Sequence, residues 1–274
     1  MPIKNSHDSS MEELKELMNG DEYLCKLHTD DIYLSRYLEC VNYDSNKAFE
    51  KMKSFYTFLQ DSPEWFTTGC PIDKKELVDK DMRIVPKEYD KAGRPIYIFK
   101  LGKIDPRIMD LAEDVVPVDD FYLEALMLDD CVAKKGLCVI VDIANFPWRV
   151  MKWLTPHNIA MCIKRILTMP IKEYRFHVVN DSFLIHAAIK IIWPFLPQYL
   201  KNSVLFHFGN LDGLQEHISK EVLPHEYAGN KEMDFDYQQF IYEKNSLIAK
   251  SFKINRKMYL ENVKDVKCNK MNKK

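Results

Sequence analysis

The chain has 274 residues and a formal net charge of −2, with 46% hydrophobic and 29% charged residues. This length suits one large domain and a smaller appendage, and the composition supplies a substantial buried core. No apolar run reaches the roughly 20 residues that a membrane-spanning helix needs. The polar start, Met1–Ser10, lacks the apolar stretch of a secretory signal. We therefore expect a globular protein of the cytosol.

Glycine and cysteine usage narrows the chemistry further. Only eight glycines are present, and neither a phosphate-binding glycine loop nor a hydrolase nucleophile elbow occurs. The seven cysteines are dispersed, without a Cys-x-x-Cys pair or histidines at zinc-ligand spacing. The sequence therefore predicts reduced thiols and no bound metal or cofactor.

Three helices are predicted at the start of the chain. Ser10 and Glu13 have the spacing of a capping box ahead of a helix over 11–18. A second helix begins near Asp31, and a third covers 45–60 with Asp44 as its N-cap. We interpret residues 1–66 as a small helical N-terminal domain.

Residues 67–235 alternate between strand and helix patterns. Long crossovers between strands imply parallel pairing with right-handed connections, and near-continuous apolar strands are typical of sheets covered on both faces. The fold class predicted here is α/β, a mostly parallel sheet flanked by helices. The predicted strands cover 82–89, 96–101, 137–141, 176–179 and 204–208, and the predicted helices 119–133, 155–169 and 183–193.

Residues 236–274 read as a polar C-terminal helix, to about Glu261, and a basic tail. From Asn245 to Lys274 nine Lys or Arg face two acidic residues, a local charge of +7 that leaves −9 elsewhere. Such a tail contacts an anionic membrane or nucleic acid, or it is a solvated chain end. These alternatives stay open at this point.

The predicted helix from Phe183 to Trp193 is unusually apolar. Its only polar side chains, His186 and Lys190, are four residues apart, so both lie on one face and roughly two-thirds of the circumference is apolar. The helix is too short to span a bilayer. It must cover an ordinary core, a bound lipid or a membrane surface.

Few residues offer catalytic chemistry. Asp142 follows a buried strand, at the edge where α/β sheets place their sites, and His177 and His207 lie on neighbouring predicted strands. No spacing motif connects them, so Asp142 is either a catalytic base or a cap for the following turn. Aromatic residues gather around the strand ends and the apolar helix, where they fill a core or surround a cavity.

Six fragments occur in the order of one known family. They are Asp31-Ile-Tyr-Leu-Ser-Arg36, Gly93-Arg94-Pro95, Gly136-Leu-Cys-Val-Ile-Val-Asp142, Val178-Val-Asn180, Trp193-Pro-Phe-Leu196 and Leu223-Pro-His-Glu-Tyr227. Together they resemble the CRAL-TRIO lipid-transfer family, nearest the branch of the alpha-tocopherol transfer protein, over about residues 20–230. Asn145, Ser182 and Ala228 replace a glycine, a proline and a glycine usual in that family.

The resemblance implies a lipid pocket in the CRAL-TRIO domain, covered by the apolar helix as a movable gate. His186 and Lys190 should then face water, while the rest of the gate meets ligand and membrane. The predicted ligand-binding residues are Val139, Val141, Ile163, Ile166, Phe176, His177, Val178, Ile185, Ala188 and Ile192. The predicted lid residues that face the membrane are Phe183, Leu184, Ile191 and Phe195.

Recognition of phosphoinositides is less well supported by the resemblance. Lys172 matches a lysine of the family and Lys201 lies near it, so both are predicted to contact anionic lipid. Most of the basic cluster expected there is absent, because the corresponding positions hold Glu39, Val41, Tyr199 and Ser203.

The predicted function is that of a non-enzymatic carrier with transient membrane contact and no nucleic-acid partner. Its ligand is one small hydrophobic molecule, and a tocopherol, a retinoid, a carotenoid, a sterol and a phospholipid remain alternatives. Other interpretations are a scaffold that kept the fold without a cavity, a phosphoinositide or phospholipid exchanger, and a hydrolase that uses Asp142.

Overall fold

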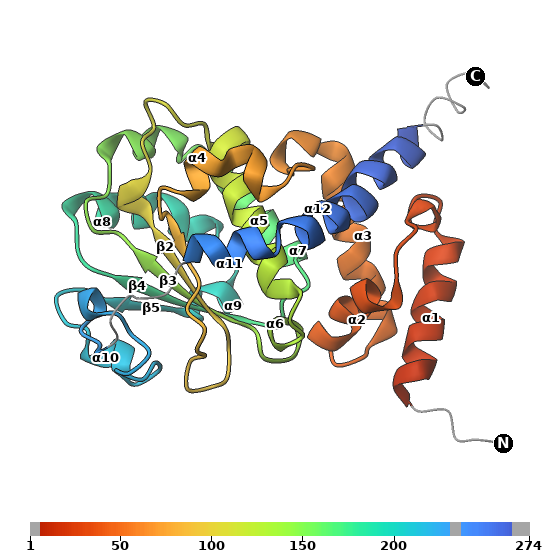
Figure 1. Cartoon of the computed structure of the whole chain (residues 1–274), viewed down its shortest axis with the longest axis horizontal. Helices are drawn as coiled ribbons and strands as arrows, with labels where there is room; N and C mark the ends of the chain where they lie inside the picture. The colour runs from red at the N-terminus through yellow and green to blue at the C-terminus, as the bar shows by residue number, and fades with distance from the viewer. Residues whose placement is uncertain (1–5, 231–236, 265–274) are drawn as a thin grey trace.

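A five-stranded sheet forms the centre of the protein, for which a computed structural model describes residues 6–230 and 237–264 (Figure 1). The strand order is β1-β2-β3-β4-β5, with β1 antiparallel to β2 and all other neighbours parallel. This confirms the predicted α/β class. The strands are β1 (Arg83–Ile84), β2 (Ile96–Lys100), β3 (Leu137–Asp142), β4 (Tyr174–Val179) and β5 (Val204–His207).

Helices connect the parallel strands and cover one face of the sheet. Because adjacent parallel strands follow each other in sequence, right-handed crossovers bring these helices to the same side. The prediction of one helix over 119–133 was wrong, since the chain breaks it between α5 and α6. The connecting helices are α5 (Val116–Met127), α6 (Cys131–Lys135), α7 (Pro156–Thr168), α8 (Phe183–Ile192) and α9 (Gln198–Lys201).

Strand alternation assigns each side chain of the sheet to one of two cores. Tyr97, Val139 and Phe176 are paired across the sheet and face the helices. Ile98 and Ile140 face the opposite side, where the segment after β5, including α10 (Asp212–Gln215), packs against them.

Gly136 fixes the entry into β3. Its φ is +98°, and a Cβ there would lie 2.4 Å from the carbonyl oxygen of Glu173. Both the backbone conformation and the close approach therefore require glycine.

The N-terminal helices are α1 (Ser6–Gly20), α2 (Asp31–Cys40) and α3 (Ser45–Asp61). Asp44 caps α3 as predicted, because its side chain accepts a hydrogen bond from the Lys47 amide. The capping box at Ser10 was a wrong prediction. Helix α1 already begins at Ser6, and the Ser10 hydroxyl instead donates to the carbonyl of Tyr43.

The C-terminal segment packs against the rest of the protein. Its helices, α11 (Tyr237–Glu243) and α12 (Asn245–Phe252), cross in front of α5 toward the N-terminal helices (Figure 1), and a π-helical turn follows α12. Ile248, Phe252 and Tyr259 are buried. Short helix α4 (Lys75–Val78) precedes β1.

The chain from Asn245 onward is therefore not a solvated end throughout, because part of it packs into the core. Arg256, one of the nine basic residues counted there, is 4% exposed. The rest of the predicted basic tail, residues 265–274, lies outside the described residues. Tyr259 and Val263 share a core with α1–α3, and the domain boundaries at 66 and 235 remain a prediction.

Candidate functional site

An apolar cavity of about 350 Å³ lies between the helix-covered face of the sheet and helices α5 and α7. This volume is near the lower end of the range for small-molecule sites. Apolar and aromatic side chains make up most of its wall. Those from the sheet are Tyr97, Phe99, Leu137, Val139, Val141, Tyr174 and Phe176, and those from α7 include Ile159, Ile163 and Ile166.

The end of α8 closes one side of the cavity through Ile192, with Leu196 just beyond it. Earlier in α8, Ile185 and Ala188 are buried against Ile143 at the end of β3. The Ser182 hydroxyl caps the helix by accepting from the Leu184 amide at 3.3 Å. Helix α8 is thus an amphipathic element lying over the carboxyl ends of β3 and β4.

Exposed apolar side chains concentrate around this helix. Phe183 is 89% exposed, Ile191 39% and Phe195 43%. Tyr199 and Phe206, a little further along the chain, are exposed as well. Clustered exposed apolar groups of this kind mark docking surfaces for membranes or proteins. We call Phe183, Ile191, Phe195, Tyr199 and Phe206 the exposed apolar strip.

Charged and polar groups are few on the cavity wall. Asp119 of α5 and Arg165 and Asn158 of α7 are among its lining residues. Arg165 donates to the carbonyl of Trp65 at 2.5 Å and to the carboxylate of Asp120. Burial opposes ionisation of Asp120, but Arg165 and Arg256 together hold the pKa of its carboxyl below the ordinary value.

Most of the predicted pocket residues on the sheet and α7 line the cavity. The structure brings together Val139, Val141, Ile163, Ile166, Phe176 and Ile192. Val178, Ile185 and Ala188 instead form a small core beneath α8. Leu184, predicted to meet a membrane, packs partly buried against the main core. His186 and Lys190 are exposed, as the helical spacing predicts.

His177 is not in the cavity, contrary to the prediction. Strand alternation turns it to the opposite face of β4, where it is wholly buried. Its Nδ1 lies 2.9 Å from Nε2 of His207, and the His217 ring lies 5.0 Å from its own ring, centroid to centroid. Burial, followed by repulsion from the other two imidazoles, lowers the pKa of His177 to about 3.

Asp142 also faces away from the cavity. One carboxylate oxygen accepts from the Ala144 amide and the Asn180 side chain, and the other accepts from the Tyr227 hydroxyl at 2.9 Å. These bonds tie the end of β3 to β4 and to the segment that covers the far face. The arrangement is that of the turn cap, the alternative to a catalytic base.

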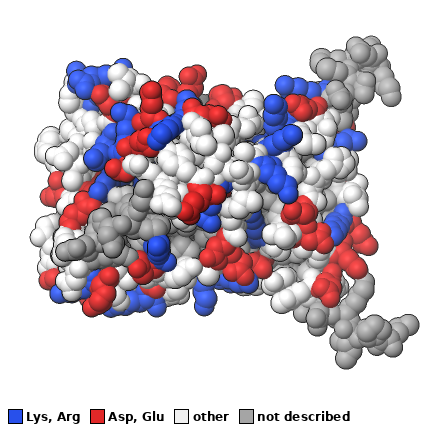
Figure 2. Space-filling view, viewed as in Figure 1, with Lys and Arg blue, Asp and Glu red and all other residues white. Residues whose placement is uncertain are grey.

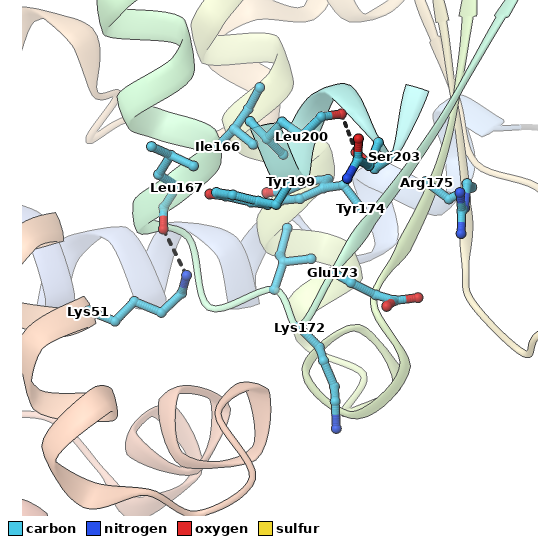
Figure 3. Close-up of a pocket in the computed structure, with 12 residues that line it drawn as sticks. Lys51, Ile166, Leu167, Lys172, Glu173, Tyr174, Arg175, Tyr199, Leu200 and Ser203 are labelled. Atoms are coloured by element: carbon cyan, nitrogen blue, oxygen red, sulfur yellow. Dashed lines mark hydrogen bonds between the residues drawn. The ribbon is translucent and has the colours of Figure 1, made fainter. Parts of the chain in front are cut away.

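A second, more polar cleft of about 340 Å³ lies where α3, the end of α7, the start of β4 and α9 meet (Figure 3). Tyr174 and Ile166 line both this cleft and the apolar cavity. Burial lowers the pKa of the Lys51 ammonium, which donates to the Leu167 carbonyl at 2.8 Å. Lys172 donates to the Asn42 side chain at 2.6 Å.

The basic side chains of this cleft do not converge. In Figure 3, Lys51, Lys172 and Arg175 point in different directions around Tyr174 and Tyr199. Lys201 is absent from the residues that line the cleft. On the face shown in Figure 2, acidic and basic side chains are likewise interspersed, without one extended basic surface. The predicted anionic-lipid contact of Lys172 and Lys201 therefore remains a prediction.

Several residues of the cavity wall were missed by sequence reasoning. Val115, which directly precedes α5, and Asp119 and Leu123 of α5 all line the cavity, and their spacing of four places them on one face of this helical segment. Tyr97 lines it opposite them and is paired with Val139. Their helical spacing could have shown that these residues share one face. It could not have shown whether that face lines a cavity or packs in the core.

Together these features define an α/β domain with a mostly parallel sheet, an apolar cavity under its helices, and an amphipathic helix at the cavity's edge. The chain belongs to the CRAL-TRIO lipid-transfer family, because the family model described as "CRAL/TRIO domain" matches residues 80–229. The predicted family is thereby confirmed.

Similar proteins include clavesins. The chain is 26% identical to clavesin-2 of Mus musculus over 206 residues, which cover 74% of this chain and 63% of that protein. It is 27% identical to clavesin-1 of Rattus norvegicus over 207 residues, 74% of this chain and 58% of that protein. The match thus spans less than two thirds of these relatives, and the particular likeness to the alpha-tocopherol transfer protein stays a prediction.

A solved structure supports the same fold. The crystal structure of Sfh5 is similar, with a TM-score of 0.51 at 10% identity, and the alignment covers 90% of this chain and 99% of that one. Among the described residues, no helix combines the length and apolar character needed to cross a bilayer.

Proposed function

We propose that the chain binds one small hydrophobic molecule in the apolar cavity and carries it through the cytosol between membranes. The observation that carries this proposal is the cavity itself, about 350 Å³ with an apolar wall. Burial of apolar ligand surface there releases roughly 25 cal/mol per Å². The α8 helix is suited to act as the gate, because Ile192 borders the cavity and Ile191, beside it, faces out.

Filling the cavity is expected to weaken lipid retention strongly. Ile163→Trp places an indole ring into the space between α7 and the sheet, where Ile163 lines the wall. The fraction of purified protein that carries lipid, measured by native mass spectrometry, should fall about tenfold, equivalent to roughly 1.4 kcal/mol of binding. Ile108→Trp, the same change at a residue that is 70% exposed, should leave it unchanged.

The outcome also separates a carrier from a scaffold. Wild-type protein that retains no lipid, and takes up none from vesicles, would identify a scaffold with an unused cavity. Equal retention by both tryptophan variants would show that lipid binds elsewhere on the chain.

Membrane docking is expected to depend on the exposed apolar strip. Ile191→Asp places a charge where the gate would enter the lipid surface, so transfer of a fluorescent lipid between vesicles should slow about tenfold. Lipid retention in solution should be unaffected, because Ile191 is not among the cavity-lining residues.

Ile32→Asp is the matched control for docking, since Ile32 lies on α2 and is 74% exposed. It should transfer lipid at the wild-type rate. A wild-type rate for Ile191→Asp would rule out docking through this strip.

A further inference from the structure

We infer that the polar end of the bound molecule is a hydrogen-bond donor, a hydroxyl group, and that Asp119 is the residue that selects it. This inference rests on the proposed function and narrows its ligand to lipid alcohols. Some polar atoms of the cavity wall are already hydrogen-bonded within the protein and others are not, and the unbonded ones are available to a ligand.

The position of Asp119 is fixed by two buried partners. One carboxylate oxygen, Oδ1, accepts from Nε of Arg83 at 2.5 Å and also from the hydroxyl of Tyr97. The Arg83 side chain is fully buried, whereas 24% of the Asp119 side chain is exposed. Burial raises the pKa of Tyr97 well above its ordinary value, so its hydroxyl stays protonated and continues to donate.

The second oxygen of Asp119 is available to a ligand. Among the described residues, no donor bonds to Oδ2, and Asp119 is a cavity-lining residue. Val115, just before α5, and Leu123 of α5 lie four residues to either side of Asp119 and line the same cavity. An ionised carboxylate oxygen is acceptor-only. A ligand that brings a hydroxyl to this position gains a charge-assisted hydrogen bond.

Other polar ends fit this wall poorly. In the described part of the chain, the guanidinium that lines the wall is that of Arg165, and it already donates to the Trp65 carbonyl and to Asp120. A fatty acid would bring its carboxylate toward the carboxylate of Asp119, and like charges repel. An aldehyde or ester has no donor and would leave Oδ2 desolvated and unpaired.

The test compares three probes that share one isoprenoid chain and differ only at the end: farnesol, farnesal and farnesoic acid. Binding to the full chain is followed by tryptophan fluorescence, because Trp153 lines the cavity. Farnesol should bind at least about tenfold more tightly than either of the others, since leaving a buried polar group unpaired is costly.

Asp119→Asn tests the residue directly. The carboxamide adds a donor, so the preference for farnesol over farnesal should shrink or reverse. Asp31→Asn, at a side chain that is 64% exposed, should keep the wild-type order of affinities. If loss of the Arg83 ion pair unfolds Asp119→Asn, the affinities of the wild-type protein for the three probes still test the preference for a hydroxyl group.

The outcomes are distinguishable. Equal affinity for all three probes, or tighter binding of the aldehyde or acid, overturns the selection by Asp119 while the carrier function stands. A wild-type preference that survives unchanged in folded Asp119→Asn overturns it too. If none of the probes binds and no lipid co-purifies, the proposed function fails and this inference fails with it.

Discussion

Asp120→Ala is expected to lower the free energy of unfolding by about 3–5 kcal/mol, the usual cost of removing one partner from a buried ion pair. Asp120 is fully buried on α5. It accepts from Arg165 of α7, from Arg256 at 2.5 Å and from the Thr67 amide at 3.2 Å. Alanine leaves two guanidinium groups buried without a counter-charge.

Urea denaturation measures this loss as a lower transition midpoint. Asp105→Ala is the comparison, because Asp105 pairs with Arg107 near the surface and its loss should lower the midpoint far less. Replacing Asp120 together with Arg165 and Arg256 by apolar residues should recover most of the stability, since none of these three charges then remains buried without a partner. A midpoint for Asp120→Ala equal to that of the control would contradict a buried charge network.

The same network explains why charge counting misjudged the C-terminal segment. Sequence alone shows Arg256 as one of nine basic residues after Asn245, and its partner Asp120 is far away in the chain. The apolar spacing of Ile248, Phe252 and Tyr259, all buried, was a local signal of packing. An ion pair between residues so far apart in the chain produces no periodic pattern in the sequence, so the sequence does not reveal it.

Local patterns predicted the elements of the sheet and most of its helices. The periods of strands and helices are local properties, so the sequence could reveal β3, α7 and β4. Asn145 and Ala228, which replace usual glycines, adopt φ values of 56° and 58°. Asparagine adopts positive φ more readily than most residues, so Asn145 can take the conformation of the usual glycine.

The cavity was predicted less completely than the fold. Alternation correctly groups Val139 with Val141, but it cannot decide which of Phe176 and His177 faces the helices without the register between strands. The register pairs Val139 with Phe176 and Ile140 with His177. Without that register the prediction placed the consecutive residues Phe176, His177 and Val178 in the pocket together, although alternation puts His177 on the opposite face from its two neighbours.

The histidine cluster should make the protein sensitive to acid. Lowering the pH from about 7 to about 5 is expected to cost roughly 2 kcal/mol of unfolding free energy through His177 alone. In the folded state the pKa of His177 is about 3, because of burial, then His207 and His217, then Arg94 and Arg175. In the unfolded chain His177 binds its proton near the ordinary histidine pKa of 6.5.

The direction of the effect follows from that difference. A histidine whose pKa is lowered in the folded state stays neutral in the native protein. Its full contribution to the unfolding free energy is therefore present above pH 6.5 and is lost between pH 6.5 and about 3. Glu216 and Asp90 oppose part of the depression at His217, but Arg94, Arg175 and burial outweigh them and lower its pKa. The pKa of His207 is lowered too, by burial and by His217.

His177→Leu isolates this contribution from the general titration of carboxylates. Urea denaturation at both pH values should show a loss on acidification about 2 kcal/mol smaller in this variant than in the wild type. His186→Gln, at an exposed histidine on α8, should retain the wild-type pH dependence. Equal losses in His177→Leu and the wild type would exclude His177 as the source. A smaller loss would assign the acid sensitivity to a group on the face of the sheet opposite the cavity, where the segment after β5 packs against Ile98 and Ile140.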